Sequence, residues 1–269
     1  MENNGSTAII TGATSGIGKE FACRFAEKGY NLIITGRRKS ELKKVAKAIS
    51  TDYRVDVQVI IGDLADQQYR QELCNRIKEA CDIDALVNNA GFGIDQSFYT
   101  IAIEEIRSMI LTHTLATVEL THAVLPGMIE RRRGMIINVS SLGAFMPGLT
   151  RSLYLGTKSF VHYFTEALST EVRPLGIRIQ SLCPGMTRSD FHRNMQNEKL
   201  EKKLRLIPFM SPEEVVNTSL VSVEKGRIFC IPGAINKLFY FIAKVLPVRV
   251  FMQIAGFRKE DALELNPLG

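Results

Sequence analysis

The sequence predicts an α/β fold in which a doubly wound parallel sheet of seven strands forms a single domain. Short apolar runs alternate with helical patterns of ten or more residues along most of the chain, and parallel strands joined by right-handed helical crossovers produce this alternation. A glycine-rich turn separates the first strand from the first helix. With 269 residues, 45% of them hydrophobic, the chain can bury a large core.

The strands are predicted from their apolar runs, and the helices from apolar residues spaced three or four apart. The predicted strands comprise residues 7–11, 31–35, 55–61, 84–87, 135–139, 177–182 and 227–231. A first helix follows the glycine turn and ends near Gly29, a residue typical of helix C-caps. Further helices are predicted at residues 40–49, 66–81, 103–131, with a break near Pro126, and 154–173. Ser211 followed by Pro212 is a typical helix start.

No linker, repeat or low-complexity segment divides the chain, so residues 1–233 are predicted to form the domain and residues 234–269 an apolar helical tail. Lys244 and Pro247 interrupt the apolar stretch at residues 238–257, which has no uninterrupted run long enough to span a bilayer. This stretch either packs on protein, which we favour, or makes peripheral contact with a membrane through its basic and apolar residues.

The net charge of +6 is compatible with nucleic acid, an anionic membrane or a phosphorylated ligand as a partner. No run of Lys and Arg exceeds three residues, so nucleic acid is not an expected partner. The five cysteines are scattered and the four histidines lack metal-binding spacing, so we expect free thiols and no metal. Together with the absence of a signal peptide pattern, this predicts a cytoplasmic location.

Three polar residues cluster around the end of the predicted strand at 135–139. Ser141 follows the strand, and after a loop Tyr154 and Lys158 stand four residues apart on one face of a predicted helix. The hydroxyl, the phenol and the ammonium can therefore meet at the carboxyl end of a buried strand, where open α/β sheets bind ligands. The alternative is a surface pair on a helix, because a second tyrosine–lysine pair in the chain has the same spacing.

The glycine turn after the first strand is a candidate phosphate-binding site. Backbone amides at a helix N-terminus can approach a pyrophosphate, and the candidate residues are Gly12, Thr14, Ser15, Gly16, Ile17 and Gly18. The spacing Gly-x3-Gly-x-Gly departs from the common dinucleotide fingerprint, so a plain tight turn is the alternative. The second strand is followed by Arg37 and Arg38 instead of an acid, which favours NADPH over NADH. Arg37 is the expected contact with the 2′-phosphate, and Arg38 is equally compatible with a solvated loop.

The chain resembles the short-chain dehydrogenase/reductase family over about residues 5–233, in particular its 3-oxoacyl reductases and 17-beta-hydroxysteroid dehydrogenases. The matching motifs are Thr11-Gly12-x3-Gly16-Ile17-Gly18, Asp63-Leu64, Asn88-Asn89-Ala90-Gly91, Ser141, Tyr154-x3-Lys158 and Pro184-Gly185. In this order the motifs are highly specific for the family. The resemblance implies a Rossmann fold, an NADP(H) cofactor, and association through two long helices into a homodimer or homotetramer.

The family's cofactor contacts carry over to several positions of this sequence. The resemblance implies that Asp63 and Leu64 flank the adenine, that Asn89, Ala90 and Gly91 line the cofactor, and that Pro184, Gly185 and Thr187 border the nicotinamide. Tyr154 and Lys158 also contact the cofactor in this interpretation.

The resemblance also assigns catalytic roles. Tyr154 is the expected general acid, and Lys158 lowers its pKa and holds the ribose hydroxyls. Ser141 is expected to hydrogen-bond the substrate oxygen, and its neighbour Ser140 is a lesser alternative. This chain has His113 where the family usually has an asparagine, whose backbone carbonyl holds a water of the proton relay. The His113 ring either joins this relay or is a hydrogen-bonded histidine without a chemical role.

We therefore expect an NADPH-dependent oxidoreductase that reduces a small-molecule carbonyl to an alcohol, with a 3-oxoacyl or other apolar ketone as substrate. Apolar residues lie near Ser141 and in residues 186–210, where the family has a substrate lid. They favour an apolar carbonyl substrate. The alternative is that they only pack the lid onto the body of the domain. A dehydrogenase of a polar alcohol such as a sugar is one alternative. A weakly catalytic NADPH-binding module is another, supported only by His113.

Overall fold

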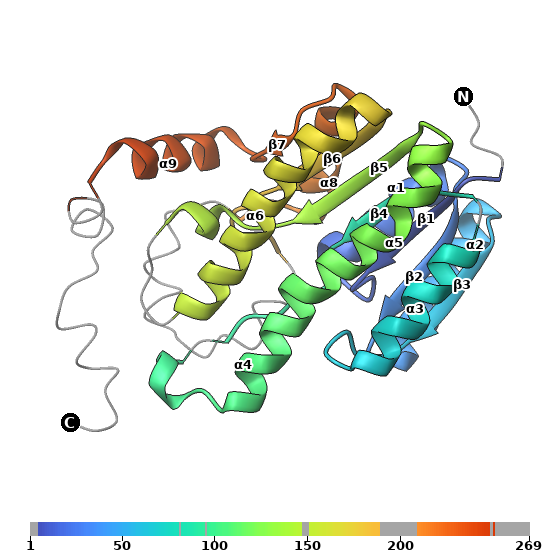
Figure 1. Cartoon of the computed structure of the whole chain (residues 1–269), viewed down its shortest axis with the longest axis horizontal. Helices are drawn as coiled ribbons and strands as arrows, with labels where there is room; N and C mark the ends of the chain where they lie inside the picture. The colour runs from blue at the N-terminus through green and yellow to red at the C-terminus, as the bar shows by residue number, and fades with distance from the viewer. Residues whose placement is uncertain are drawn as a thin grey trace.

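The computed structural model describes residues 5–80, 82–94, 96–146, 151–188, 209–247 and 250. It contains a parallel sheet of seven strands in the order β3-β2-β1-β4-β5-β6-β7 (Figure 1). The strands are β1 (Thr7–Thr11), β2 (Asn31–Gly36), β3 (Val57–Ile61), β4 (Ile83–Asn88), β5 (Gly134–Val139), β6 (Ile177–Leu182) and β7 (Phe229–Cys230). The predicted doubly wound parallel sheet is thus confirmed.

Helices cover both faces of the sheet, as Figure 1 shows. One face is covered by α1 (Gly16–Glu27), α2 (Lys39–Tyr53) and α8 (Pro212–Glu224). The other face is covered by α3 (Gln67–Glu79), α5 (Ala116–Glu130) and α6 (Ser152–Val172). The predicted start of α8 is borne out, because Ser211 and Glu214 form a reciprocal capping box.

Alternate residues of the central strands pack against opposite helical layers, which explains why these strands read as continuous apolar runs. Ile10 and Ile34 belong to the core beneath α1 and α2, whereas Ile9 and Leu86 belong to the core beneath α3 and α5. Burying each such side chain contributes about 1.5–3 kcal/mol. Strand β1 lies between β2 and β4, where the crossovers change direction. In doubly wound sheets a ligand-binding crevice forms at this point, beyond the carboxyl ends of the strands.

The long helix predicted at residues 103–131 is interrupted at a different place from the prediction. Helix α4 (Ile103–Ile110) continues through a π-helical turn, η2 (Leu111–Leu115), into α5, and Pro126 lies within α5. The predicted break at Pro126 is wrong because Pro126 and His122, whose carbonyl loses its helical donor, both lie on the exposed side of α5. Water can replace the missing donor there. The π turn instead carries His113 into the interior.

The C-terminal helix α9 (Ala234–Val245) packs on the domain along one face. Asn236 is buried and donates from Nδ2 to the carbonyl of Pro232 at 2.8 Å. Phe239 and Tyr240 pack against a small apolar cluster that includes Leu142. Helix α9 therefore covers residues 234–245 of the predicted tail and is anchored to the domain, and the extent of the tail stays a prediction.

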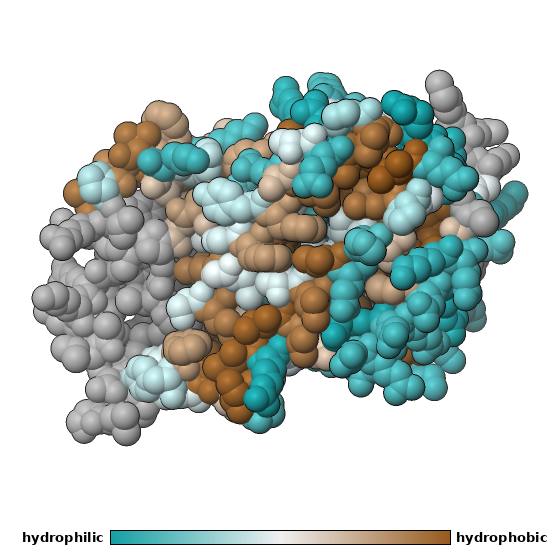
Figure 2. All heavy atoms as spheres, in the orientation of Figure 1, coloured by the Kyte–Doolittle hydropathy of each residue, from teal (hydrophilic) through white to brown (hydrophobic). Residues whose placement is uncertain are grey.

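The opposite face of α9 carries exposed apolar residues: Ile235, Leu238, Phe241 and Val245. They appear as hydrophobic surface on this helix in Figure 2. Within the described ranges, no helix combines the length and apolar character needed to cross a membrane. Much of the stretch 246–257 lies outside the described residues, so the choice between protein and membrane contact for this face stays a prediction.

Candidate active site

A cavity of about 510 Å³ opens at the carboxyl ends of the central strands. Most of the site residues predicted from the sequence line it, namely Gly12, Thr14, Ser15, Gly16, Ile17, Arg37, Asp63, Leu64, Asn89, Ala90, Gly91, Ser141, Tyr154, Lys158, Pro184, Gly185 and Thr187. The other two, Gly18 and His113, are not among its described lining residues. The cavity thus joins the glycine turn and the tyrosine–lysine pair in one continuous site.

The glycine turn lies so close to the loop after β4 that side chains cannot replace two of its glycines. Gly12 has a φ of +68°, and a Cβ atom there is 2.9 Å from the Cα of Ala90. Asn89 donates from Nδ2 to the carbonyls of Thr11 and Gly12, at 3.0 and 3.2 Å. A Cβ atom on Gly18, in the first turn of α1, would overlap the carbonyl oxygen of Gly12. Such a tightly held turn before a helix N-terminus is suited to hold a phosphate.

Replacing Gly18 with alanine is expected to lower the free energy of unfolding by about 1–3 kcal/mol, because the turn must shift to admit a methyl group. Chemical denaturation of the full chain measures this change. Gly156→Ala is the matched control, because Gly156 also lies in a helix and a Cβ atom there meets no described atom within 4 Å. The control variant is expected to be as stable as wild type or slightly more stable. Equal stability of the two variants contradicts the close approach at Gly18.

Tyr154 and Ser141 meet at the end of β5. Ser141 precedes the short helix η3 (Leu142–Phe145), its Oγ accepts the N–H of Gly143 at 3.1 Å, and a hydrogen bond joins its side chain to Tyr154. Burial raises the pKa of Tyr154 above its ordinary value, and the Ser141 hydrogen bond and the Arg151 guanidinium oppose this rise only in part. The phenol is therefore protonated at neutral pH and can donate a proton.

Lys158 lies one helical turn beyond Tyr154 and is 5% exposed. Its Nζ donates to the carbonyl of Val139 at 2.8 Å and lies 5.8 Å from the centre of the Tyr154 ring. Burial lowers the pKa of Lys158 to about 8, so the ammonium form still prevails at neutral pH. The hydroxyl of Ser140 donates to the carbonyl of Lys158 at 2.7 Å, so Ser140 binds the helix backbone while Ser141 faces the phenol.

The two arginines after β2 both line the cavity but have different partners. Arg37 forms an exposed ion pair with Asp63 at 3.4 Å. Arg38 reaches over the glycine turn, and its Nη2 donates to Thr14 Oγ1 at 2.6 Å and to Ser15 Oγ at 2.9 Å. Sequence reasoning gave Arg38 no preference over a solvated loop residue. Its position directly after a strand beside the turn was the available signal.

His113 lies behind the wall of the cavity and is 1% exposed. Its Nε2 accepts the N–H of Phe92 at 3.0 Å, and its Nδ1 lies 2.9 Å from the hydroxyl of Thr157. Burial and, to a lesser degree, the nearby charge of Lys158 hold the pKa of His113 well below its ordinary value. The ring is therefore neutral, and both of its nitrogens have hydrogen-bond partners. The sequence offered no signal for Thr157.

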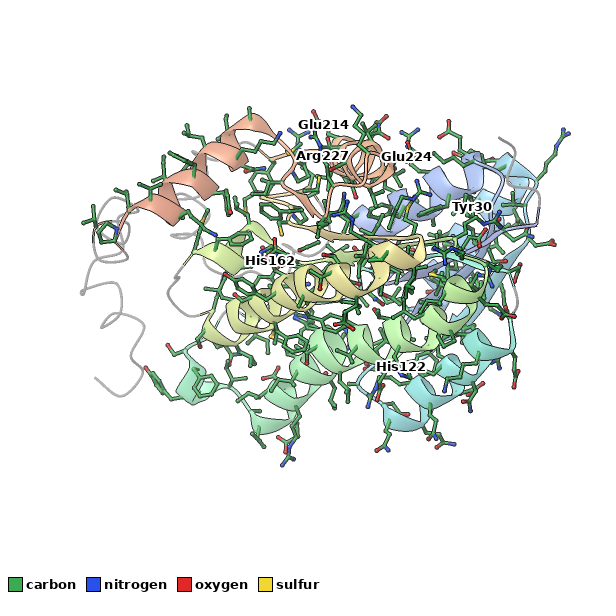
Figure 3. The ribbon with its side chains drawn as sticks, turned by 45° about the horizontal axis from the view of Figure 1, so that its top comes forward. Tyr30, His122, His162, Glu214, Glu224 and Arg227 are labelled. Carbon is green, nitrogen blue, oxygen red and sulfur yellow. The ribbon has the colours of Figure 1, made fainter. Side chains whose placement is uncertain are left out.

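The apolar residues expected from the sequence near Ser141 are Phe92, Leu142, Phe145, Met146 and Leu149, and the described ones separate into two groups. Phe92, Leu142 and Met146 line the cavity. Phe145 instead packs against Tyr240 of α9 and against His162 of α6, with ring centroids 4.8 and 4.6 Å apart. His162 is labelled on α6 in Figure 3. Most of the predicted substrate lid, residues 189–208, lies outside the described residues, as does Leu149.

Arg151 is a further cavity residue that the sequence analysis did not single out. It is the N-cap residue of α6, it lines the cavity, and its positive charge lowers the pKa of Tyr154. A guanidinium three residues before a candidate acid was a visible signal. Its proximity in the folded chain makes it part of the electrostatic environment of the phenol.

Comparison with known proteins gives a consistent result. A sequence model described as short chain dehydrogenase matches residues 6–200. Over 259 residues the chain is 31% identical to a protein of Anas platyrhynchos named very-long-chain 3-oxoacyl-CoA reductase, and the match covers 93% of this chain and 78% of that protein. A protein of the same name from Pyrenophora tritici-repentis is 31% identical over 229 residues, which cover 82% of this chain and 64% of that protein. The chain thus spans just under two thirds of the fungal relative.

A solved structure shares the fold over almost the whole chain. It is described as a short-chain dehydrogenase from Sphingobium yanoikuyae in complex with NADPH. The TM-score is 0.79 at 28% sequence identity, and the superposition covers 98% of each chain.

Proposed function

The chain belongs to the short-chain dehydrogenase family of oxidoreductases, and we propose that it reduces a carbonyl compound to an alcohol with NADPH. The observation that carries this proposal is the meeting of Tyr154, Ser141 and the buried Lys158 in the cavity that begins at the glycine turn. A proton donor and a hydrogen-bond donor for one substrate oxygen thus lie beside a suitable cofactor site.

The cavity fits a dinucleotide. At Gly12 and Gly18 there is no room for a side chain. The absence of side chains in the turn lets its backbone amides approach a pyrophosphate. All five residues expected at the two ends of the cofactor line the cavity. Asp63 and Leu64 follow the edge strand β3 and are expected to flank the adenine, whereas Pro184, Gly185 and Thr187 follow β6 and are expected to border the nicotinamide. When bound, NADPH supplies the hydride for the reduction.

The residues of the chain provide the proton and stabilise the charge. Tyr154 holds a proton on its phenol oxygen at neutral pH because burial raises its pKa. Ser141 orients the phenol and can donate a hydrogen bond to the substrate oxygen as negative charge develops on it. The Lys158 ammonium, held on the carbonyl of Val139, lies near enough to stabilise the phenolate that remains after proton transfer.

We propose that the 2′-phosphate of NADPH is held by Arg37 and Arg38 together. Both guanidinium groups line the cavity, and Arg38 is already held over the turn by Thr14 and Ser15. Arginine is suited to this role because its planar guanidinium can bind two phosphate oxygens at once. This assignment keeps Arg37 as a contact and adds Arg38.

Replacing Arg38 with alanine is expected to raise the dissociation constant of NADPH about tenfold or more, with little change for NADH, because a charge-assisted hydrogen bond to phosphate is lost. Arg37→Ala is expected to act in the same direction. Titration of each variant with both cofactors, followed by fluorescence, measures the ratio. Lys43→Ala on the exposed side of α2 controls for loss of positive charge. An unchanged preference in both arginine variants contradicts the 2′-phosphate contact.

We propose an apolar ketone, such as a 3-oxoacyl thioester, as the substrate. The cavity wall near Ser141 is formed by Phe92, Leu142, Met146 and Leu155, and the relatives from duck and fungus carry the name of 3-oxoacyl-CoA reductases. A polar sugar alcohol finds fewer hydrogen-bonding partners beside these residues.

A substrate screen tests the proposed function. The full chain is mixed with NADPH and with 3-oxoacyl thioesters, steroid-like ketones and small-sugar carbonyls, and NADPH oxidation is followed by absorbance. Turnover is expected with the apolar ketones. Turnover of sugars alone supports the polar-alcohol alternative. Tight NADPH binding with turnover of no carbonyl supports the interaction module and contradicts the reductase.

Association into a homodimer or homotetramer also stays a prediction. The exposed apolar residues on the two long helical segments favour it: Ile103, Ile110, Leu115, Phe160 and Tyr163. Residues of α4 contribute to the hydrophobic surface that Figure 2 shows beside α6. Sedimentation equilibrium of the full chain measures the mass of the assembly, and a monomer at all concentrations contradicts the prediction.

A further inference from the structure

We infer that His113 is a positioning residue, whose neutral imidazole ties the cofactor-lining loop after β4 to the helical turn that carries Tyr154. This inference rests on the proposed function for its catalytic consequence, but the hydrogen bonds on which it stands are independent of the reaction. It assigns the ring a part in holding the site, and no part in the relay of protons.

The polarity of the hydrogen bonds defines the tautomer of the ring. A backbone N–H can only donate, so the nitrogen that receives the N–H of Phe92, Nε2, carries a lone pair. The single proton of the neutral ring is then on Nδ1 and is donated to the hydroxyl of Thr157. Thr157 in turn donates its own proton to the carbonyl of Tyr154 at 2.8 Å. Each donor in this series of hydrogen bonds, from Phe92 through His113 and Thr157 to Tyr154, therefore has one acceptor.

The backbone around His113 is shaped to hold the ring in this place. His113 is the middle residue of the π-helical turn η2, and its carbonyl accepts the hydroxyl proton of Thr117 at 2.8 Å. A Cβ atom on Gly91 is 3.0 Å from Nε2 and 3.4 Å from the Nζ of Lys158. The imidazole therefore fills the space that a glycine leaves between the cofactor loop and the catalytic lysine. Irregular π turns are frequent at functional sites.

The two ring nitrogens hold two different parts of the site. The Nε2 bond fixes the backbone at Phe92, next to Gly91, and both residues line the cavity at the cofactor position. The Nδ1 bond acts through Thr157 on the backbone of Tyr154, and the rings of His113 and Tyr154 are in edge contact at 5.9 Å. Loss of the first bond should loosen the cofactor loop, and loss of the second should misplace the phenol.

Two substitutions separate these bonds. The amide nitrogen of asparagine can occupy the place of Nδ1, but the asparagine side chain is too short to reach Phe92. The amide oxygen of the longer glutamine side chain can occupy the place of Nε2. His113→Asn is expected to raise the Kd of NADPH about tenfold with the smaller effect on kcat. His113→Gln is expected to lower kcat about tenfold with the smaller effect on the Kd of NADPH. Thr157→Val should reproduce the glutamine profile, and Thr170→Val, on the exposed side of α6, serves as its control.

Nuclear magnetic resonance of the full chain tests the tautomer without any reaction. The ¹⁵N shifts of His113 are expected to report a proton on Nδ1 from about pH 5.5 to about pH 8.5, the range in which an ordinary histidine titrates. A ring that titrates in this range, or that carries its proton on Nε2, overturns the inference. The inference is also overturned if His113→Asn and His113→Gln change kcat and the Kd of NADPH in the same way. Failure of every carbonyl substrate contradicts the proposed reductase, and the shifts and NADPH affinities then still decide the role of His113.

Discussion

Replacing Tyr154 with phenylalanine is expected to lower kcat for carbonyl reduction about a thousandfold. The ring and its packing remain, but the proton donor is lost, and positioned acids contribute about 10²–10⁴-fold to such reactions. NADPH binding should change little, because the phenol is one group in a cavity with many other contacts. Steady-state kinetics and NADPH titration on the same preparation measure the two effects. Near-normal kcat in this variant refutes Tyr154 as the acid.

Tyr163→Phe is the matched control for this experiment. Tyr163 lies on the same helix, is 59% exposed and is not among the described residues that line the cavity, so kcat should stay within about twofold of wild type. The pH dependence gives a second check. Because burial raises the pKa of Tyr154, the protonated phenol persists through neutral pH, and reduction should fall only as pH rises toward that raised value. Oxidation of the alcohol, which needs the phenolate, should rise over the same range.

Replacing Lys158 with methionine is expected to lower kcat about a hundredfold and at the same time to stabilise the cofactor-free protein. The activity falls because the positive charge beside Tyr154 is lost. The stability rises because a buried ammonium is costly, and its pKa of about 8 instead of 10.5 corresponds to about 3 kcal/mol. Loss of the hydrogen bond to the carbonyl of Val139 lowers this stabilisation by about 1 kcal/mol. The expected net stabilisation at pH 7 is about 2 kcal/mol.

The sign of this effect defines its pH dependence. Below about pH 8 both the native and the unfolded wild-type chain carry the Lys158 proton, so the full cost of the buried charge is present. Between about pH 8 and pH 10.5 the native chain has lost this proton while the unfolded chain retains it, so wild-type stability rises with pH. The advantage of Lys158→Met should therefore shrink over this range.

Urea denaturation of both proteins at several pH values measures this dependence. Lys43→Met, an exposed lysine on α2, is the control and should change stability by less than about 0.5 kcal/mol. A Lys158→Met variant that is less stable than wild type at pH 7 shows that the ammonium is well solvated or well paired, and contradicts the cost inferred from its burial.

Much of the fold could be predicted because most strands coincide with short runs of apolar residues in the sequence. The bounds of β1 and β6 agree with the prediction. In β1 the apolar run Ala8-Ile9-Ile10 lies between polar residues and Gly12, whereas β6 agrees although three of its six residues are polar. The predictions for β3 and β7 began two residues too early, since pairing with a neighbour, and not composition, decides where an edge strand begins. The break near Pro126 was predicted from proline alone, whereas the side of the helix on which Pro126 lies decides whether the helix tolerates it.

The candidate site was predictable where a motif is contiguous and unpredictable where partners are distant in the chain. Tyr154 and Lys158 are four residues apart, so helical geometry alone places them together. The partners of His113, by contrast, are 21 and 44 residues away. Arg38 likewise finds its two hydroxyl partners 24 and 23 residues earlier. Local sequence cannot report such contacts, because they depend on how strands and helices are arranged in space.

The sequence by itself determined the doubly wound sheet through hydrophobic periodicity, and it brought the phenol, ammonium and hydroxyl offered for catalysis together through residue spacing. The family was identified from the resemblance of its motifs. Only the tertiary structure decided which serine faces Tyr154, that Arg38 reaches the glycine turn, and that the His113 ring is neutral with both nitrogens bonded. The physical reason is that the direction and the charge of a polar side chain depend on burial and on its neighbours. Those neighbours are brought together by packing between elements that are far apart in the chain.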